Sequence, residues 1–135
     1  MIKFRTLSRN EQLTLDERRF SLGNFLRVTN LDELPQLWNI LKGEMSLVGP
    51  RPLPIEYASL FSEEQKRRHD VLPGITGLAQ ISGKNTITWS EKFKYDLEYV
   101  NNVSFLMDCM ILLKTLTLVL SMKRDVSLQE DKFNG

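Results

Sequence analysis

The chain has 135 residues, of which 41% are hydrophobic and 26% charged, the composition of a folded domain rather than of a disordered segment. Its net charge is only +1 at pH 7, so it lacks the large basic excess that is usual for nucleic-acid-binding domains. One cysteine, Cys109, and one histidine, His69, exclude an internal disulfide and any multi-Cys or multi-His metal centre. The length predicts one domain over residues 1–124, followed by a polar tail over 125–135.

The N-terminal part carries two predicted elements. Residues 2–7 alternate between polar and apolar side chains, which predicts a short strand with Lys3 and Arg5 on one face. A helix is expected from residue 16 to residue 28, and its inward-facing residues are Phe20, Phe25 and Leu26. The opening MIKFRTLSRN is charged and has no apolar run, so no secretory signal is expected there.

The stretch from Leu26 to Pro52 has the strongest local signals. Asn30 is a good helix N-cap, and Glu33 three residues later completes a capping-box pattern. Pro35 has no backbone N–H and fits only near a helix start, so we expect a helix to begin close to Asp32. Apolar residues then recur at steps of three and four, which predicts a buried helical face made of Leu34, Leu37, Trp38 and Leu41.

Asp32, Glu33 and Arg51 in this stretch can each be interpreted as structural residues or as parts of a phosphate-binding site. Asp32 and Glu33, at a helix start, are most often solvated caps, but a helix N-terminus also attracts anions such as phosphate. Gly43 should end the helix, and the Gly-Pro-Arg-Pro turn at 49–52 should fix the direction of Arg51. A guanidinium there suits phosphate oxygens or a nearby carboxylate.

The middle of the chain predicts short elements. Two short helices are expected over 55–61 and 62–70, the second with a capping box of Ser62 and Gln65. His69 is expected to have a structural or supporting role rather than to be a general base.

The stretch LPGITGLAQISGKNTIT has no helical period. Strand-like pieces at 78–81 and 86–88, joined by a turn at 83–85, predict a small β-hairpin.

A longer helix should follow Thr88, which forms a capping box with Glu91. Its core-facing residues are spaced by four, four and three: Trp89, Phe93, Leu97 and Val100. Asp96 falls off that face, where it is either an exposed acid or a supporting acid of a site.

Residues 103–122 form the most apolar stretch, but Asp108 and Lys114 interrupt it, so a membrane-spanning helix is not expected. A buried helix or one that lies in a membrane interface fits better. Together the elements predict an α+β fold, mainly helical, in which short amphipathic helices and a small β-hairpin form one compact domain at a membrane surface.

Four segments resemble the signature of the bacterial sugar transferases, the monotopic polyprenyl-phosphate phosphoglycosyl transferases. They are KFRT at 3–6, LRVTNLDELPQLWNILKGEMSLVGPRP at 26–52, RRHDVLPGITGLAQISGKN at 67–85 and WSEKFKYDLEYVNNVSFLMD at 89–108. The resemblance implies transfer of a sugar 1-phosphate from a UDP-sugar to polyprenyl (undecaprenyl) phosphate, with Mg²⁺ and a covalent aspartyl-phosphosugar intermediate. It implies a position at the cytoplasmic face of the bacterial inner membrane, monotopic or peripheral, at the first membrane step of glycoconjugate synthesis, and it allows a homo-oligomer. It also implies a hydrophobic re-entrant helix ahead of KFRT, the segment at which this sequence begins.

The resemblance also implies site residues. Asp32 would be the nucleophile, and Asp32 and Glu33 would hold Mg²⁺. The remaining implied contacts are Arg27, Arg51, Lys3 and Arg5 for phosphate, Gln80, Lys84 and Asn85 for the nucleotide-sugar loop, and Asp96 as a supporting acid. The chain departs from the family pattern at Glu44, where Asp is common, and at Lys84, where Arg is frequent. An alternative function is a catalytically silent family fragment that binds a membrane surface or a partner. No residue decides which sugar is the donor or which pathway uses the product.

Overall fold

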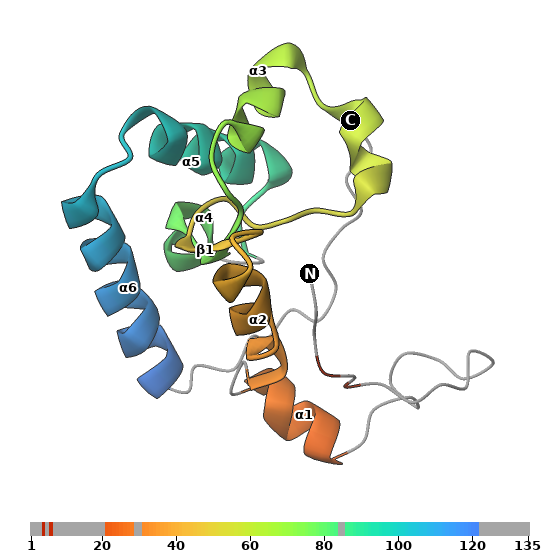
Figure 1. The fold of residues 1–135 in the computed structure, drawn as a ribbon, viewed down its shortest axis with the longest axis vertical. Helices are drawn as coiled ribbons and strands as arrows, with labels where there is room; N and C mark the ends of the chain where they lie inside the picture. Colours follow the sequence, from red (N-terminus) through yellow and green to blue (C-terminus); the bar gives the residue numbers. More distant parts are fainter. Residues whose placement is uncertain (1–3, 5, 7–20, 29–30, 84–85, 122–135) are drawn as a thin grey trace.

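The computed structural model describes residues 4 and 6 and the ranges 21–28, 31–83 and 86–121. These residues form a mainly helical fold with one small sheet, as predicted (Figure 1). The elements, with η for a 3₁₀ helix, are α1 (Ser21–Val28), η1 (Leu31–Glu33), α2 (Gln36–Leu41), β1 (Ser46–Val48), η2 (Ile55–Leu60), α3 (Glu63–Lys66), η3 (Arg67–His69), β2 (Gly74–Thr76), α4 (Leu78–Ser82), α5 (Trp89–Asn101) and α6 (Phe105–Leu120). The predicted strand at 2–7, apart from residues 4 and 6, the helix start at 16–20 and the tail at 125–135 lie outside the described residues.

Two of the three predicted capping boxes are confirmed, and the third depends on Asn30, which lies outside the described residues. The Gln65 N–H donates to Ser62 Oγ at 3.2 Å, and the Ser62 N–H donates to Gln65 Oε1 at 2.9 Å. At the start of α5 the Glu91 N–H donates to Thr88 Oγ1 at 3.2 Å, and the Thr88 N–H donates to Glu91 Oε2 at 2.8 Å. Each box satisfies N–H groups that have no partner inside the helix, so these helices begin where the sequence predicted.

The sheet differs from the predicted hairpin. It pairs β1 and β2 in parallel, with Ser46 opposite Gly74 and Val48 opposite Thr76. Gly74 is required there, because a Cβ at that position would collide with the backbone of Val48 and Gly49. Residues 78–82 form helix α4, and residues 86–88 form no strand, so the predicted β-hairpin is wrong. The partner of β2 comes from 28 residues earlier in the chain, which no local pattern reveals.

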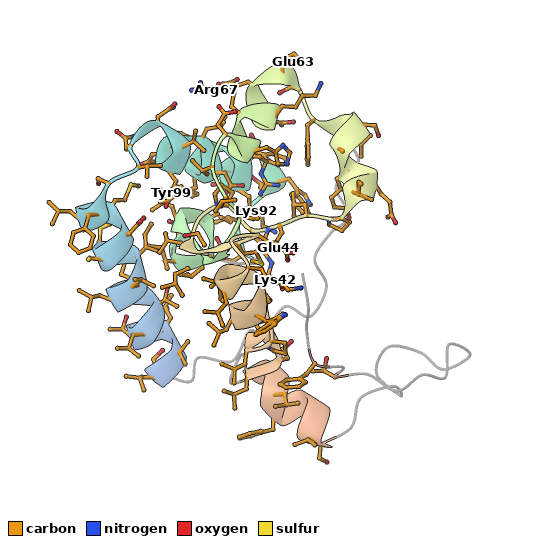
Figure 2. The ribbon with its side chains drawn as sticks, in the orientation of Figure 1. Lys42, Glu44, Glu63, Arg67, Lys92 and Tyr99 are labelled. Atoms are coloured by element: carbon orange, nitrogen blue, oxygen red, sulfur yellow. The ribbon has the colours of Figure 1, made fainter. Side chains whose placement is uncertain are left out.

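The core gathers around α5. Phe93 is buried against Phe61, while Tyr99 packs with Val48 of β1 and Ile111 of α6. The Tyr99 hydroxyl lies 2.8 Å from an Asp108 carboxylate oxygen, to which it donates, so it joins α5 to α6 (Figure 2). Burial and this bond to a carboxylate both raise the pKa of the Tyr99 phenol.

Helix α2 buries the face opposite to the one that was predicted to lie in the core. Its start is also later than predicted, since Asp32 lies in η1 and α2 begins only at Gln36. The apolar residues expected in the core are exposed: Leu34 by 49%, Leu37 by 45%, Trp38 by 57% and Leu41 by 79%. Gln36 and Asn39 are buried instead, and Asn39 Nδ2 donates to Glu44 Oε2 at 2.6 Å. The apolar period identified one face of the helix correctly, but the described residues cover the other face.

Other helices also expose apolar side chains. In α6 only Ile111 is fully buried, while Phe105, Leu106 and Leu113 are 81%, 79% and 66% exposed. Phe25 of α1, which was predicted to face inward, is 55% exposed. Of the two alternatives predicted for residues 103–122, a fully buried helix is therefore wrong, and a helix that lies in a membrane interface stays a prediction. Among the described residues no helix is long and apolar enough to cross a membrane.

Candidate functional site

The two adjacent carboxylates lie in η1, immediately before α2. Both Asp32 and Glu33 are half-buried. The Phe4 N–H donates to the Asp32 backbone oxygen at 2.9 Å, which brings the start of the chain beside the dyad. Lys3 and Arg5, the predicted phosphate contacts on either side of Phe4, lie outside the described residues.

Glu33 and Arg51 form an ion pair across the site. Arg51 Nη2 donates to Glu33 Oε1 at 3.1 Å, although 18 residues separate the two in sequence. The Glu33 side chain is 14% exposed and that of Arg51 is 38% exposed, so the pair lies at the protein surface with one side in solvent. The structure therefore brings together two of the predicted site residues.

A buried ion pair between Arg68 and Asp96 contacts the backbone of Arg51. Arg68 donates to Asp96 Oδ2 through Nε at 3.1 Å and through Nη2 at 2.7 Å, and both residues are 4% exposed. Arg68 Nη2 also donates to the backbone oxygen of Arg51 at 2.7 Å. The Arg68 guanidinium lies over the rings of Phe61 and Phe93, at 5.8 and 5.6 Å from their centres.

Asp96 is therefore not an exposed acid, and it binds Arg68, whose guanidinium also donates to the Arg51 backbone oxygen. Burial raises the pKa of its carboxyl above the usual range, and the neighbouring Arg68 opposes that rise. Arg68 was missed by the sequence prediction. It stands in a run of three basic residues, Lys66 to Arg68, and nothing in that run distinguishes the one whose side chain is buried.

A cavity of about 320 Å³ opens between α2 and α6, and Glu33 and Arg51 line it. Its other walls are largely apolar and come from Leu34, Leu37, Leu118 and Val119, with Thr76 and Thr115 between them. A smaller cavity of about 160 Å³ lies next to Pro50, Arg68 and His69. Arg51 lines both cavities.

Gln80, a predicted residue of the nucleotide-sugar loop, lines the larger cavity. Its amide nitrogen and oxygen are buried and have no hydrogen-bond partner among the described residues. An unsatisfied buried amide is costly, so the site has polar capacity left for a ligand. Lys84 and Asn85 lie outside the described residues, as does the side chain of Arg27 in α1.

A metal ion could be held only in part by the described residues. No three His, Cys, Asp or Glu side chains among them come together as a site of their own. Mg²⁺ commonly takes one or two carboxylates and completes its coordination with substrate phosphates and water. Asp32 and Glu33 fit that donor set, and Mg²⁺ binding there stays a prediction.

Comparison with known proteins decides the family. Residues 1–122 match the family described as "Bacterial sugar transferase". The chain belongs to this family. Among its relatives is the "Uncharacterized sugar transferase EpsL" of Bacillus subtilis, which is 49% identical over 89% of this chain and 62% of its own length.

Two further relatives have more specific names. The "Undecaprenyl-phosphate galactose phosphotransferase" of Salmonella typhimurium is 42% identical over 81% of this chain and 23% of its own length. The "UDP-glucose:undecaprenyl-phosphate glucose-1-phosphate transferase" of Xanthomonas campestris is 36% identical over 91% of this chain and 29% of its own length. The chain thus spans less than two thirds of the length of each of these three relatives.

Proposed function

We propose that this sugar transferase moves a sugar 1-phosphate from a UDP-sugar to polyprenyl phosphate. The relatives from Salmonella and Xanthomonas are named for sugar transfer to undecaprenyl phosphate, and their similarity covers most of this chain. The observation that carries the proposal is the contact of Arg51 with Glu33, beside Asp32, at the wall of a cavity with both charged and apolar lining.

The proposed chemistry has two displacements at one phosphorus atom. An Asp32 carboxylate oxygen attacks the β-phosphorus of the UDP-sugar, and the bond from that phosphorus to the bridging oxygen breaks, which releases UMP with the electron pair. A phosphate oxygen of the lipid then attacks the same phosphorus and displaces Asp32 as the free carboxylate. A carboxylate nucleophile splits one difficult step into two easier ones.

Glu33 and Arg51 would manage charge during both steps. Arg51 can turn from Glu33 toward phosphate oxygens, which its planar guanidinium binds in a forked geometry. When bound, Mg²⁺ would neutralise the diphosphate and stabilise the leaving UMP. Asp32 and Glu33 are the residues that would hold it.

The exposed apolar side chains support a position at a membrane surface. Exposed apolar patches on a folded protein commonly mark membrane or protein contacts. Leu41 of α2 and Leu106 and Leu113 of α6 are at least 66% exposed. We propose that these helices contact the cytoplasmic face of the inner membrane, where both substrates are available.

The test is intact-mass spectrometry of the protein mixed with Mg²⁺ and a panel of UDP-sugars, without lipid. We expect an added mass equal to one sugar phosphate, together with released UMP. The Asp32→Asn variant, whose fold is checked by circular dichroism, should form no adduct. UMP release by that variant at a substantial fraction of the wild-type rate would exclude Asp32 as the nucleophile. A folded wild-type protein that forms no adduct with any donor would favour the silent, membrane-binding alternative.

A further inference from the structure

Gln80 has hydrogen-bonding groups that the fold does not use. Its amide nitrogen and oxygen are both buried, and neither has a partner among the described residues. The other polar residues that line the larger cavity have partners. Arg51 donates to Glu33 at 3.1 Å, and Thr76 shares a hydrogen bond of 2.7 Å with Thr115. A buried amide without partners destabilises the fold, so its presence beside a cavity indicates a ligand that completes it.

The amide can enter the cavity without losing a hydrogen bond. Gln80 lines the cavity, but its amide rests against the backbone of Gly77, where a Cβ would come within 2.8 Å of the amide oxygen. A turn about the side-chain torsions moves the amide toward the cavity, and this turn breaks no hydrogen bond among the described residues. A ligand that bonds the turned amide therefore gains contacts at little cost.

The chemistry of an amide selects among the parts of the proposed substrates. A carboxamide has an acceptor oxygen beside an NH2 donor, so a ligand satisfies both only if it offers a donor and an acceptor side by side. Phosphate oxygens satisfy only the nitrogen, and an isoprenoid chain satisfies neither atom. Two parts of a UDP-sugar satisfy both: a pair of neighbouring sugar hydroxyls, each of which donates and accepts, and the N–H and C=O edge of uracil.

We infer that Gln80 is a specificity-determining residue that binds two neighbouring hydroxyls of the transferred sugar. The inference rests on the proposed function and names a residue that selects the donor. The sugar is joined directly to the phosphate that Asp32 attacks, whereas uracil lies beyond a second phosphate and the ribose. Glu33, the neighbour of Asp32, lines the same cavity as Gln80, which favours the sugar over the base. A donor that lacks one of the two hydroxyls leaves the amide half-satisfied and is disfavoured.

Monodeoxy donors test the inference. The UDP-sugar that reacts fastest is compared with analogues that each lack one sugar hydroxyl, by UMP release without lipid. For the wild type we expect the loss of either of two neighbouring hydroxyls to lower kcat/KM about tenfold to a hundredfold, the effect of an unpaired buried polar group. Gln80→Met has a similar volume and no amide, so it should accept the parent sugar and these analogues nearly alike. Equal rates of the wild type with every analogue would overturn the inference.

The ratio between the parent sugar and its analogue separates sugar binding from a structural role. A residue that only supports the fold would change the rate with every donor equally. Gln36→Met is the matched control: Gln36 of α2 also has a buried amide nitrogen without a partner among the described residues, but it lines neither cavity. This variant should keep the wild-type ratio. Thermal unfolding checks that both variants are folded, and Gln80→Met should not lower Tm, because it removes two unpaired buried atoms.

The outcomes distinguish this inference from the proposed function. UMP release by Gln80→Met with the wild-type ratio would reject Gln80 as the sugar-binding residue and keep the function. A preference for UDP-sugars over CDP-sugars that disappears in Gln80→Met, without any effect of the deoxy sugars, would assign the amide to uracil and also overturn the inference. Calorimetry with Asp32→Asn measures the same discrimination as binding, without turnover. Discrimination there, with no UMP release by the wild type, would keep Gln80 as the sugar-binding residue and reject the function; no discrimination in either assay would reject both.

Discussion

Arg68 Nη2 donates a hydrogen bond to the backbone oxygen of Arg51 at 2.7 Å, across 17 residues of sequence. The same guanidinium is held by Asp96, and the Arg51 side chain reaches Glu33 at 3.1 Å. The buried Arg68, which donates hydrogen bonds to both Asp96 and the Arg51 backbone, thus fixes the backbone from which the Arg51 side chain projects. Placement errors of about 1 Å are enough to lower catalytic rates strongly, so this support should matter for activity.

The first prediction concerns Arg68→Lys. Lysine keeps the charge but cannot bond Asp96 and the Arg51 carbonyl from one rigid plane, so we expect kcat/KM to fall about tenfold, the value of one hydrogen bond to a charged group. If Arg68 acts through Arg51, the same change in an Arg51→Ala background should have little further effect. Arg67→Lys is the matched control, because Arg67 is exposed and bonds Asn101 Oδ1 instead (Figure 2). Additive losses in the double variant would reject a role through Arg51.

The second prediction concerns stability. Asp96→Ala leaves the buried Arg68 charge without its partner, and we expect the free energy of unfolding to fall by about 3–5 kcal/mol. Glu98→Ala, two residues away on the same helix but exposed, should change it by less than about 0.5 kcal/mol. Urea unfolding followed by circular dichroism measures both. Asp96→Asn keeps an acceptor oxygen for Arg68, so its loss in the free energy of unfolding should lie between those of Asp96→Ala and Glu98→Ala. If Asp96→Ala lost less than Glu98→Ala, water would have replaced the carboxylate as the partner of Arg68, which would contradict this prediction.

Part of the fold and of the site could be predicted from the sequence, and part could not. Capping boxes such as Ser62 with Gln65 depend on neighbours three residues apart, and they were predicted correctly. The exposure of Leu37 and the burial of Gln36 depend on which face of α2 other segments cover, which an amphipathic pattern leaves open. Arg51 and Glu33 were expected from one motif, whereas Arg68 enters the site from a different part of the chain. Local rules therefore predicted the starts of α3 and α5, whereas the residue that supports Arg51 could be found only in the tertiary structure.

The third prediction concerns the start of α5. Thr88→Ala removes a capping oxygen, and we expect a loss of about 1 kcal/mol in the free energy of unfolding.

Hydrogen bonds from Thr88 lower the pKa of the Glu91 carboxyl. A lowered pKa in the folded state stabilises the protein above the unfolded value, and that contribution disappears as the pH falls through the folded value. The difference in Tm between wild type and Glu91→Gln should therefore be largest near pH 7 and shrink on acidification below about pH 4.5, the ordinary pKa range of glutamate. A difference that grows in acid would contradict this assignment.

The fourth prediction concerns the metal. If Asp32 and Glu33 hold Mg²⁺ with the substrate phosphates, EDTA should abolish UMP release and added Mg²⁺ should restore it. Glu33→Gln removes one anionic ligand and also the partner of Arg51, so we expect the Mg²⁺ concentration at half-maximal rate to rise at least about tenfold, within the range seen when metal-site residues are changed. Glu56→Gln, an exposed carboxylate in η2, serves as the control for a loss of general negative charge. Titration of the initial rate of UMP release with Mg²⁺ measures the shift. An unchanged Mg²⁺ requirement with a lower maximal rate would assign Glu33 to the positioning of Arg51 rather than to the metal.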